Sequence, residues 1–147
     1  MRFMVFVKAT PESEAGVMPA TEMLDAMGKF NQELIDAGVL IDAAGLQPSS
    51  KAARVRFSGS KRSVIDGPFA ETKELVAGYW VWEVKSLAEA IEWVKRCPDP
   101  HPGSSEAVIE IRPLFDVDDF ENAPPEVVAQ EKAFRAKNER KRTGKKK

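Results

Sequence analysis

The sequence predicts an α+β fold, on the basis of two observations. Segments with the apolar patterns of β-strands alternate with two long helical patterns along residues 2–115. The 147 residues, 43% of them hydrophobic and 31% charged, also have the size and composition of a single folded domain. We therefore expect one domain over residues 1–115 and a charged extension over residues 116–147 that is partly helical or disordered.

The first half of the chain is predicted to form a strand, a helix and a second strand. Residues 2–8 have apolar side chains on both faces of a strand. A helix is expected from about residue 20 to 37, and Gly38 is placed to end it. Residues 39–46 form the second apolar segment. The stripe that defines the helix consists of Met23, Met27, Phe30 and Leu34.

The second half begins with a short hairpin over residues 53–65, which turns at Gly59. Residues 76–84 have the strongest strand pattern of the chain. A second helix begins at the N-cap Ser86, and its capping-box pattern and basic last turn agree with that start. Residues 107–115 are expected to be the last strand of the core.

This order of elements is that of a ferredoxin-like fold with a β-hairpin insertion. Right-handed crossovers place both helices on one face of such a sheet, so the other face has no cover within one subunit. A large apolar patch is rare on a monomer, and we therefore expect a homodimer in which two sheets form an α/β barrel. Burial of that patch would contribute on the order of 10 kcal/mol before association costs. The apolar face is expected to include Phe3 or Met4, Trp80 or Trp82, and Ile109 or Ile111.

Composition and motifs exclude several classes of function. A net charge of −1 and a pI near 5.9 provide no general attraction to nucleic acid or to anionic membranes. Cys97 is the only cysteine and no long apolar run follows Met1, so we expect a cytoplasmic protein that does not contact membranes. The sequence has no glycine-rich phosphate loop, no paired Cys or His zinc ligands and no nucleophile elbow. We therefore expect no cofactor and no metal.

Nine consecutive residues, DGPFAETKE at Asp66–Glu74, resemble the signature of the YCII-related, DGPF-type proteins. The resemblance covers about residues 1–115 and implies the ferredoxin-like dimeric α/β barrel. Most of that family has no assigned activity, although a His at the start of the first helix and an Asp have been proposed as a catalytic pair in some relatives. Residues 19–22 of this chain contain no His, so that mechanism is not transferred.

The signature allows a structural and a functional interpretation. In the structural one, Asp66 satisfies nearby N–H groups of a turn that Gly67 makes possible. In the functional one, Asp66, Glu71 and Glu74 surround Lys73, and their partial burial would suit a carboxyl group to acid–base chemistry. The structural interpretation is the more common one for such a mixed charge cluster.

Further candidates lie outside the signature. His101, the only imidazole, is held between two prolines; it is either an exposed loop residue or a proton shuttle opposite Asp66 or Glu71. Trp80 and Trp82 either line a pocket or belong to the core. Arg112 either binds an anion or pairs with a neighbouring acid.

The C-terminal extension ends in a basic run over residues 140–147 after a predicted helix over residues 126–141. A solvated terminus is favoured over a contact with nucleic acid. Within the domain, we predict a homodimer that binds an unidentified small molecule through Lys73, Glu74, Trp80, Trp82 and Arg112 and serves as a sensor or accessory protein. The alternative is a cofactor-independent enzyme that uses Asp66, Glu71 and His101 for acid–base chemistry on a small organic acid or carbonyl compound.

Overall fold

The computed structural model describes residues 1–144 of the chain. These residues separate into two compact units, one over Met1–Pro113 and one that begins at Leu114. The first unit contains the sheet and the helices expected for the core. The second contains the charged extension.

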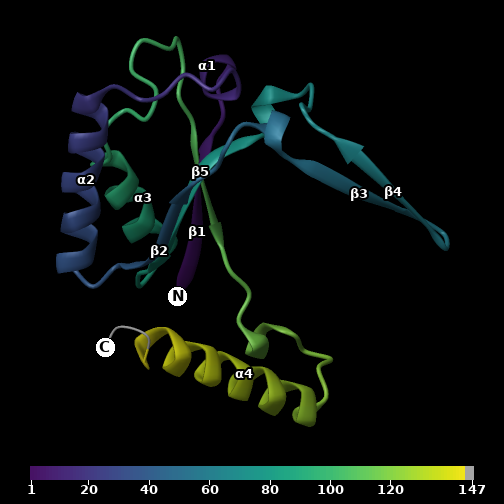
Figure 1. Cartoon of the computed structure of the whole chain (residues 1–147). Coiled ribbons are helices and arrows are strands. Elements are labelled where there is room, and N and C mark those ends of the chain that lie inside the picture. Colours follow the sequence, from purple (N-terminus) through teal and green to yellow (C-terminus); the bar gives the residue numbers. More distant parts are fainter. Residues whose placement is uncertain (145–147) are drawn as a thin grey trace. The chain divides into compact units, whose positions relative to one another are not determined.

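A four-stranded antiparallel sheet forms the centre of the first unit (Figure 1). Its strand order is β2-β5-β1-β6, with β2 at Leu40–Gly45, β5 at Val76–Glu83, β1 at Arg2–Lys8 and β6 at Ile109–Pro113. All three neighbouring pairs are antiparallel. Together with the helices, this sheet confirms the predicted α+β class. The last strand is shorter than the predicted segment 107–115.

Two helices cover one face of this sheet, namely α2 (Thr21–Asp36) and α3 (Leu87–Lys95) (Figure 1). Gly38, with a φ of +71°, follows the end of α2 in the left-handed conformation expected of a helix-terminating glycine. Ser86 caps α3 by accepting the backbone N–H of Glu89 at 3.2 Å. The predicted capping box is only half formed, because the Glu89 carboxylate accepts the N–H of Lys85 instead of that of Ser86.

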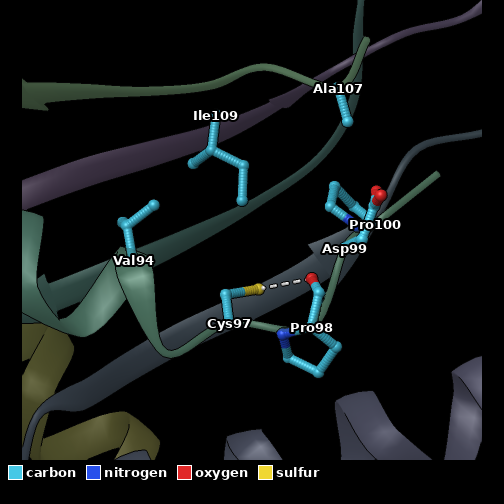
Figure 2. Close-up of a pocket in the computed structure, with 7 residues that line it drawn as sticks. All are labelled: Val94, Cys97, Pro98, Asp99, Pro100, Ala107 and Ile109. Atoms are coloured by element: carbon cyan, nitrogen blue, oxygen red, sulfur yellow. Dashed lines mark hydrogen bonds between the residues drawn. The ribbon is translucent and has the colours of Figure 1, made fainter. Parts of the chain in front are cut away.

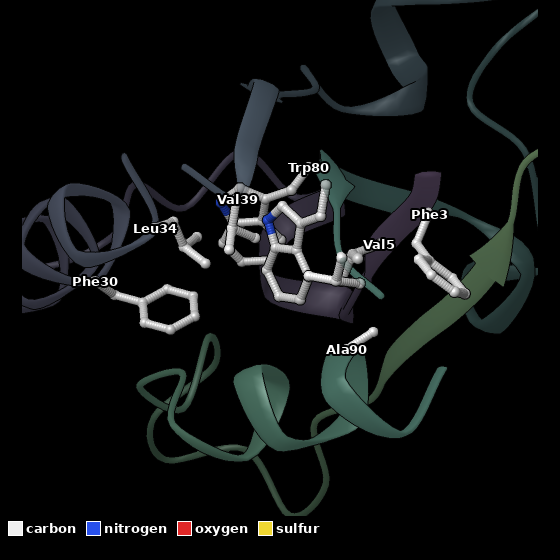
Figure 3. Packing of buried hydrophobic residues seen from close by; sticks show 9 residues of the cluster. Phe3, Val5, Phe30, Leu34, Val39, Trp80 and Ala90 are labelled. Atoms are coloured by element: carbon white, nitrogen blue, oxygen red, sulfur yellow. The ribbon is translucent and has the colours of Figure 1, made fainter. Parts of the chain in front are cut away.

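The hydrophobic core lies between the sheet and these helices (Figure 3). Phe3 of β1 pairs with Trp82 of β5, and both side chains are fully buried. Phe30 of α2 meets Trp80 and Trp82 edge-on, with ring centroids 6.0 and 6.3 Å apart. Trp80 Nε1 donates a hydrogen bond to Asn31 Oδ1 at 2.7 Å, whereas Trp82 Nε1 has no hydrogen-bond partner within residues 1–144.

The opposite face of the sheet carries Met4, Phe6, Tyr79 and Val81, which we call the open face. Met4 pairs with Val81 and Phe6 with Tyr79, so these four side chains alternate with the core residues along the same two strands. The expectation that a tryptophan and one of Ile109 and Ile111 would lie on the open face was wrong, since both isoleucines pair with Val5 and Val7 of β1 and pack against the core. Both tryptophans lie at the alternate positions of β5 whose side chains point to the helix-covered face. Their large rings fill the space beneath α2 and α3.

A separate two-stranded hairpin interrupts the central order, with β3 at Ala53–Ser58 and β4 at Lys61–Asp66. Gly59, with a φ of +59°, forms its tip, as the sequence predicts. The hairpin extends away from α2 and α3, on the other side of the sheet (Figure 1). The segment between β1 and α2 contains one short helix, α1 (Pro11–Glu14).

The second unit contains a 3-10 turn and one long helix, α4 (Pro125–Gly144), which includes the predicted helix. An ion pair of 3.0 Å joins Lys132 of α4 to Asp118 of the turn. No residue of α4 is buried within the described part of the helix. The last three lysines of the predicted basic run lie outside the described residues.

Candidate functional site

The signature loop is held against the segment that follows β2. Gly67 donates its N–H to the carbonyl oxygen of Ala52 at 2.9 Å, and the Gly67–Pro68 peptide bond is cis. A Cβ atom at position 67 would lie 1.6 Å from the carbonyl oxygen of Ser49, a distance that no pair of non-bonded atoms adopts. Glycine is therefore required here because two backbone segments touch, and the structural interpretation of this part of the signature has a direct geometric cause.

Ser49 connects the signature loop to α1. Its side chain is 6% exposed, and its Oγ accepts the N–H of Phe69 at 3.0 Å. The hydroxyl donates to the carboxylate of Glu14, which also accepts the Ser49 N–H at 3.2 Å. A capping box between Thr10 and Ser13 starts α1 and positions Glu14 at its end. The sequence analysis missed both Ser49 and Glu14, because residues 35 positions apart show no local pattern.

The four charged residues of the signature are exposed in the isolated chain. Asp66 ends β4 and pairs with Ala53, whereas Lys73 and Glu74 lie in the 3-10 helix η2 (Thr72–Glu74), directly after Glu71. The partial burial expected of the three acids is therefore absent from this chain on its own. The aromatic member of the loop is more constrained, because the guanidinium of Arg54 lies 3.7 Å from the centre of the Phe69 ring.

His101 lies at the same end of the sheet, beyond α3. Its Nε2 is 2.9 Å from the carbonyl oxygen of Lys8, the last residue of β1. Because a carbonyl oxygen can only accept, Nε2 carries the hydrogen and Nδ1 of the neutral ring keeps its lone pair. Next to Lys8, Ala9 donates its N–H to Leu75, which directly follows η2. Within residues 1–144, however, no hydrogen bond or ion pair joins His101 to Asp66 or Glu71.

The open face brings together apolar and polar side chains. Its centre consists of Met4, Phe6, Tyr79 and Val81, all of them half-buried. Arg112 of β6 pairs with Met4, and Glu110 of β6 pairs with Phe6, so both charged side chains lie on the same face. Arg112 was among the predicted ligand-binding residues, whereas Tyr79 and Glu110 were not part of that set. The period-two alternation of β5 and β6 contained the signal for both, once the tryptophans were assigned to the core.

Trp80 and Trp82, also predicted to bind a ligand, lie beneath the helices. Trp82 is 0% exposed and Trp80 5%, so neither ring offers a surface to a ligand in the isolated chain. Their effect on the open face is indirect, because they fix the strand that carries Tyr79 and Val81.

A pocket of about 260 Å³ lies between α3 and β6, and its lining residues include none of the predicted site residues (Figure 2). Its walls include Val94, Ile109 and the thiol of Cys97, whose Sγ is 3.2 Å from the carbonyl oxygen of Pro98. Burial of the thiol, together with the nearby charge of Asp99, raises the pKa of Cys97 from its ordinary value of 9.0 to about 11. The thiol is therefore protonated at neutral pH and is a poor nucleophile.

We expect iodoacetamide to alkylate native Cys97 about 100-fold more slowly near neutral pH than it alkylates a free thiol, since two pKa units separate their thiolate fractions. Folding favours the protonated thiol, so the stability that it contributes is present below pH 9.0 and is lost as the pH rises towards about 11. Mass spectrometry of timed reactions measures the rate, and the urea-unfolded chain is the control. Equal rates for the native and the unfolded chain would contradict this prediction.

The model of the YCII-related domain matches residues 1–116. The chain belongs to the YCII-related family. An uncharacterised protein of Rhizobium meliloti (strain 1021) is 36% identical to it over 88 residues, which are 60% of this chain and 69% of that protein. The family predicted from the sequence is thereby confirmed.

A weaker likeness connects this YCII-related chain with a solved enzyme. That enzyme is 5-chloro-2-hydroxyhydroquinone dehydrochlorinase from Burkholderia phenoliruptrix AC1100, solved in complex with 2,5-dihydroxybenzoquinone. The matched region covers 75% of this chain and 91% of the enzyme's chain. The identity is 14% and the TM-score 0.41, so nothing about the chemistry of that enzyme is transferred to the YCII-related chain. Within residues 1–144, no helix is long and apolar enough to cross a membrane, and no three His, Cys, Asp or Glu side chains are grouped as metal ligands.

Proposed function

We propose that this YCII-related chain is a subunit of a homodimer that binds a small molecule and acts as a sensor or accessory protein. The observation that supports this function best is the open face. Half-buried Met4, Phe6, Tyr79 and Val81 lie together on the face of the sheet opposite α2 and α3 (Figure 1). A ferredoxin-like subunit with such a face conceals it by pairing with a second sheet, which creates a dimeric α/β barrel.

The open face also indicates the chemical class of the ligand. Phe6 and Tyr79 present rings, and the guanidinium of Arg112 comes from the strand on the other side of β1. An Arg guanidinium binds a carboxylate through two parallel hydrogen bonds, and a dry cavity strengthens that contact. A small organic acid with an apolar body fits this set of groups. Lys73 and Glu74, in η2 at one end of the sheet, are proposed to lie at the mouth of the cavity.

Replacing Arg112 with Gln is expected to weaken binding of such an acid about 10- to 100-fold, because a hydrogen bond to a charged group contributes about 1.5–3 kcal/mol. Isothermal titration calorimetry with benzoate and succinate measures the change. Arg140→Gln removes the same charge from exposed α4 and is the matched control. If neither acid binds the wild-type dimer, or if Arg112→Gln binds as tightly as the wild type, this assignment of the ligand is wrong.

The acid–base enzyme is the second candidate, and the contact of His101 with Lys8 favours it. That contact leaves Nδ1 of the neutral ring able to accept a proton. The ring lies at the end of the sheet where η2 leads into β5. Asp66 and Glu71 would then be acidic partners on the opposite side of the cavity mouth. Proton NMR of a bound carbonyl compound in D2O separates the two candidates: exchange of its α-hydrogens supports catalysis, and an unchanged spectrum leaves binding alone.

A further inference from the structure

The β3–β4 hairpin has one apolar and one basic face. The pairs Val55–Val64 and Phe57–Arg62 point to one side of the ribbon, and Arg54, Arg56 and Lys61 belong to the other. The relative exposures of Val55, Phe57 and Val64 are 53%, 70% and 68%. The apolar face of the hairpin, defined here by these three residues, is therefore uncovered in the isolated chain.

Within residues 1–144, only the base of the hairpin is anchored to the rest of its own subunit. There, the N–H of Gly67 donates a hydrogen bond to the carbonyl oxygen of Ala52, and the guanidinium of Arg54 packs on the ring of Phe69. Near the tip, the guanidinium of Arg62 donates to the carbonyl oxygens of Gly59 and Lys61 and lies 4.3 Å from the centre of the Phe57 ring. A two-stranded ribbon is marginally stable in water unless its apolar side is packed against another element. The exposed face therefore requires a partner.

The direction of the hairpin identifies that partner. The ribbon extends on the side of the sheet that faces away from α2 and α3, which is also the side of the open face (Figure 1). A second subunit packed on the open face lies alongside the ribbon, and two-fold symmetry gives each subunit one such arm. The charges of the two surfaces also favour a second subunit as the partner. The hairpin carries four cationic side chains and one acid, whereas acids outnumber cations in the rest of the chain.

We propose that the β3–β4 hairpin is an arm that packs its apolar face onto the partner subunit and so secures the dimer. This inference rests on the proposed function, since it requires the homodimer. The arm adds three apolar side chains per subunit to the interface of the open face. It also accounts for the position of the signature, because the loop with Gly67 and Phe69 holds the base from which the arm extends.

The test is a dilution series in sedimentation velocity on the full-length chain. The double variant Phe57→Ser/Val64→Ser is expected to raise the Kd of the dimer about 100-fold or more, because burial of two apolar side chains is lost. Both positions are exposed in the isolated subunit, so its fold is expected to be retained. The matched control Leu24→Ser/Ile35→Ser removes two exposed apolar side chains from α2 and is expected to leave the Kd unchanged.

Two further measurements separate failure of the arm from failure of the dimer. Val81→Glu, on the open face, is expected to dissociate the wild-type dimer. A wild-type chain that is monomeric at all concentrations would overturn both proposals, whereas a dimer that is broken by Val81→Glu and unaffected by Phe57→Ser/Val64→Ser would overturn the arm alone. Tryptic cleavage after Lys61 and Arg62 should slow as the wild-type concentration rises. A constant rate in a proven dimer, or protection only by an added DNA duplex, would also overturn the arm.

Discussion

Replacing Gly67 with Ala is expected to destabilise the folded chain by about 3 kcal/mol or more, because the new methyl group overlaps a backbone atom that cannot rotate away. The Cβ would lie 1.6 Å from the carbonyl oxygen and 2.6 Å from the carbonyl carbon of Ser49. The loop must therefore move, and its movement breaks the hydrogen bonds from Gly67 to Ala52 and from Phe69 to Ser49. Urea unfolding, followed by tryptophan fluorescence, measures the loss.

Gly28→Ala is the matched control for that substitution. Gly28 lies inside α2, and a Cβ there meets no other atom within 4 Å. Because alanine is the better helix former, this variant is expected to be more stable than the wild type by about 0.5–1 kcal/mol. The same chemical change thus has opposite signs at two positions. A Gly67→Ala variant as stable as the wild type would show that the signature loop does not need its close approach to Ser49.

Replacing Trp82 with Ala is expected to cost about 3–5 kcal/mol, the range for removing a large aromatic side chain from a packed core. Trp82 is fully buried and contacts the rings of Phe30 and Trp80. The same urea titration measures this loss. It would establish that the ring supports the sheet from the helix side, in contrast to its predicted role in ligand binding.

Trp82→Phe is the informative control, because it keeps an aromatic ring and removes the buried Nε1–H that has no partner within residues 1–144. A buried N–H without a hydrogen bond is a cost to the folded state, so its removal offsets part of the volume lost. We expect Trp82→Phe to lose about half as much stability as Trp82→Ala, or less. Equal losses would indicate that Nε1 is satisfied in solution, for example by an ordered water molecule.

Local sequence patterns predicted most helices and strands of the first unit. They did not predict which face of each strand points towards the helices. The helix expected over residues 20–37 is α2 at Thr21–Asp36, and the hairpin expected over residues 53–65 is β3 and β4. Apolar stripes, a terminating glycine and a turn glycine are sufficient for this, because each acts within a few residues. On β1 and β5 both faces are apolar, so alternation alone left open which face the helices cover.

The candidate site was predictable only where chemistry is concentrated in sequence. The run Asp66–Glu74 was found because it is continuous, and Arg112 because a cation on a strand is conspicuous. Ser49 and Glu14 were missed, since neither residue has a local pattern and they meet only when α1 and the segment after β2 are brought together. His101 was identified by its chemistry, but Lys8, the residue that it contacts at the end of β1, lies 93 residues earlier in the sequence.

The sequence by itself determined the α+β class, the order of the elements and membership of the YCII-related family, because these depend on patterns within short segments and on a continuous motif. Only the tertiary structure decided that the tryptophans lie under the helices, that Met4, Phe6, Tyr79 and Val81 form the open face, and that Gly67 touches Ser49. The physical reason is that side-chain burial is a property of whole packed layers. A strand with two apolar faces can satisfy its own pattern in either orientation, and only the volume beneath the helices selects one of them.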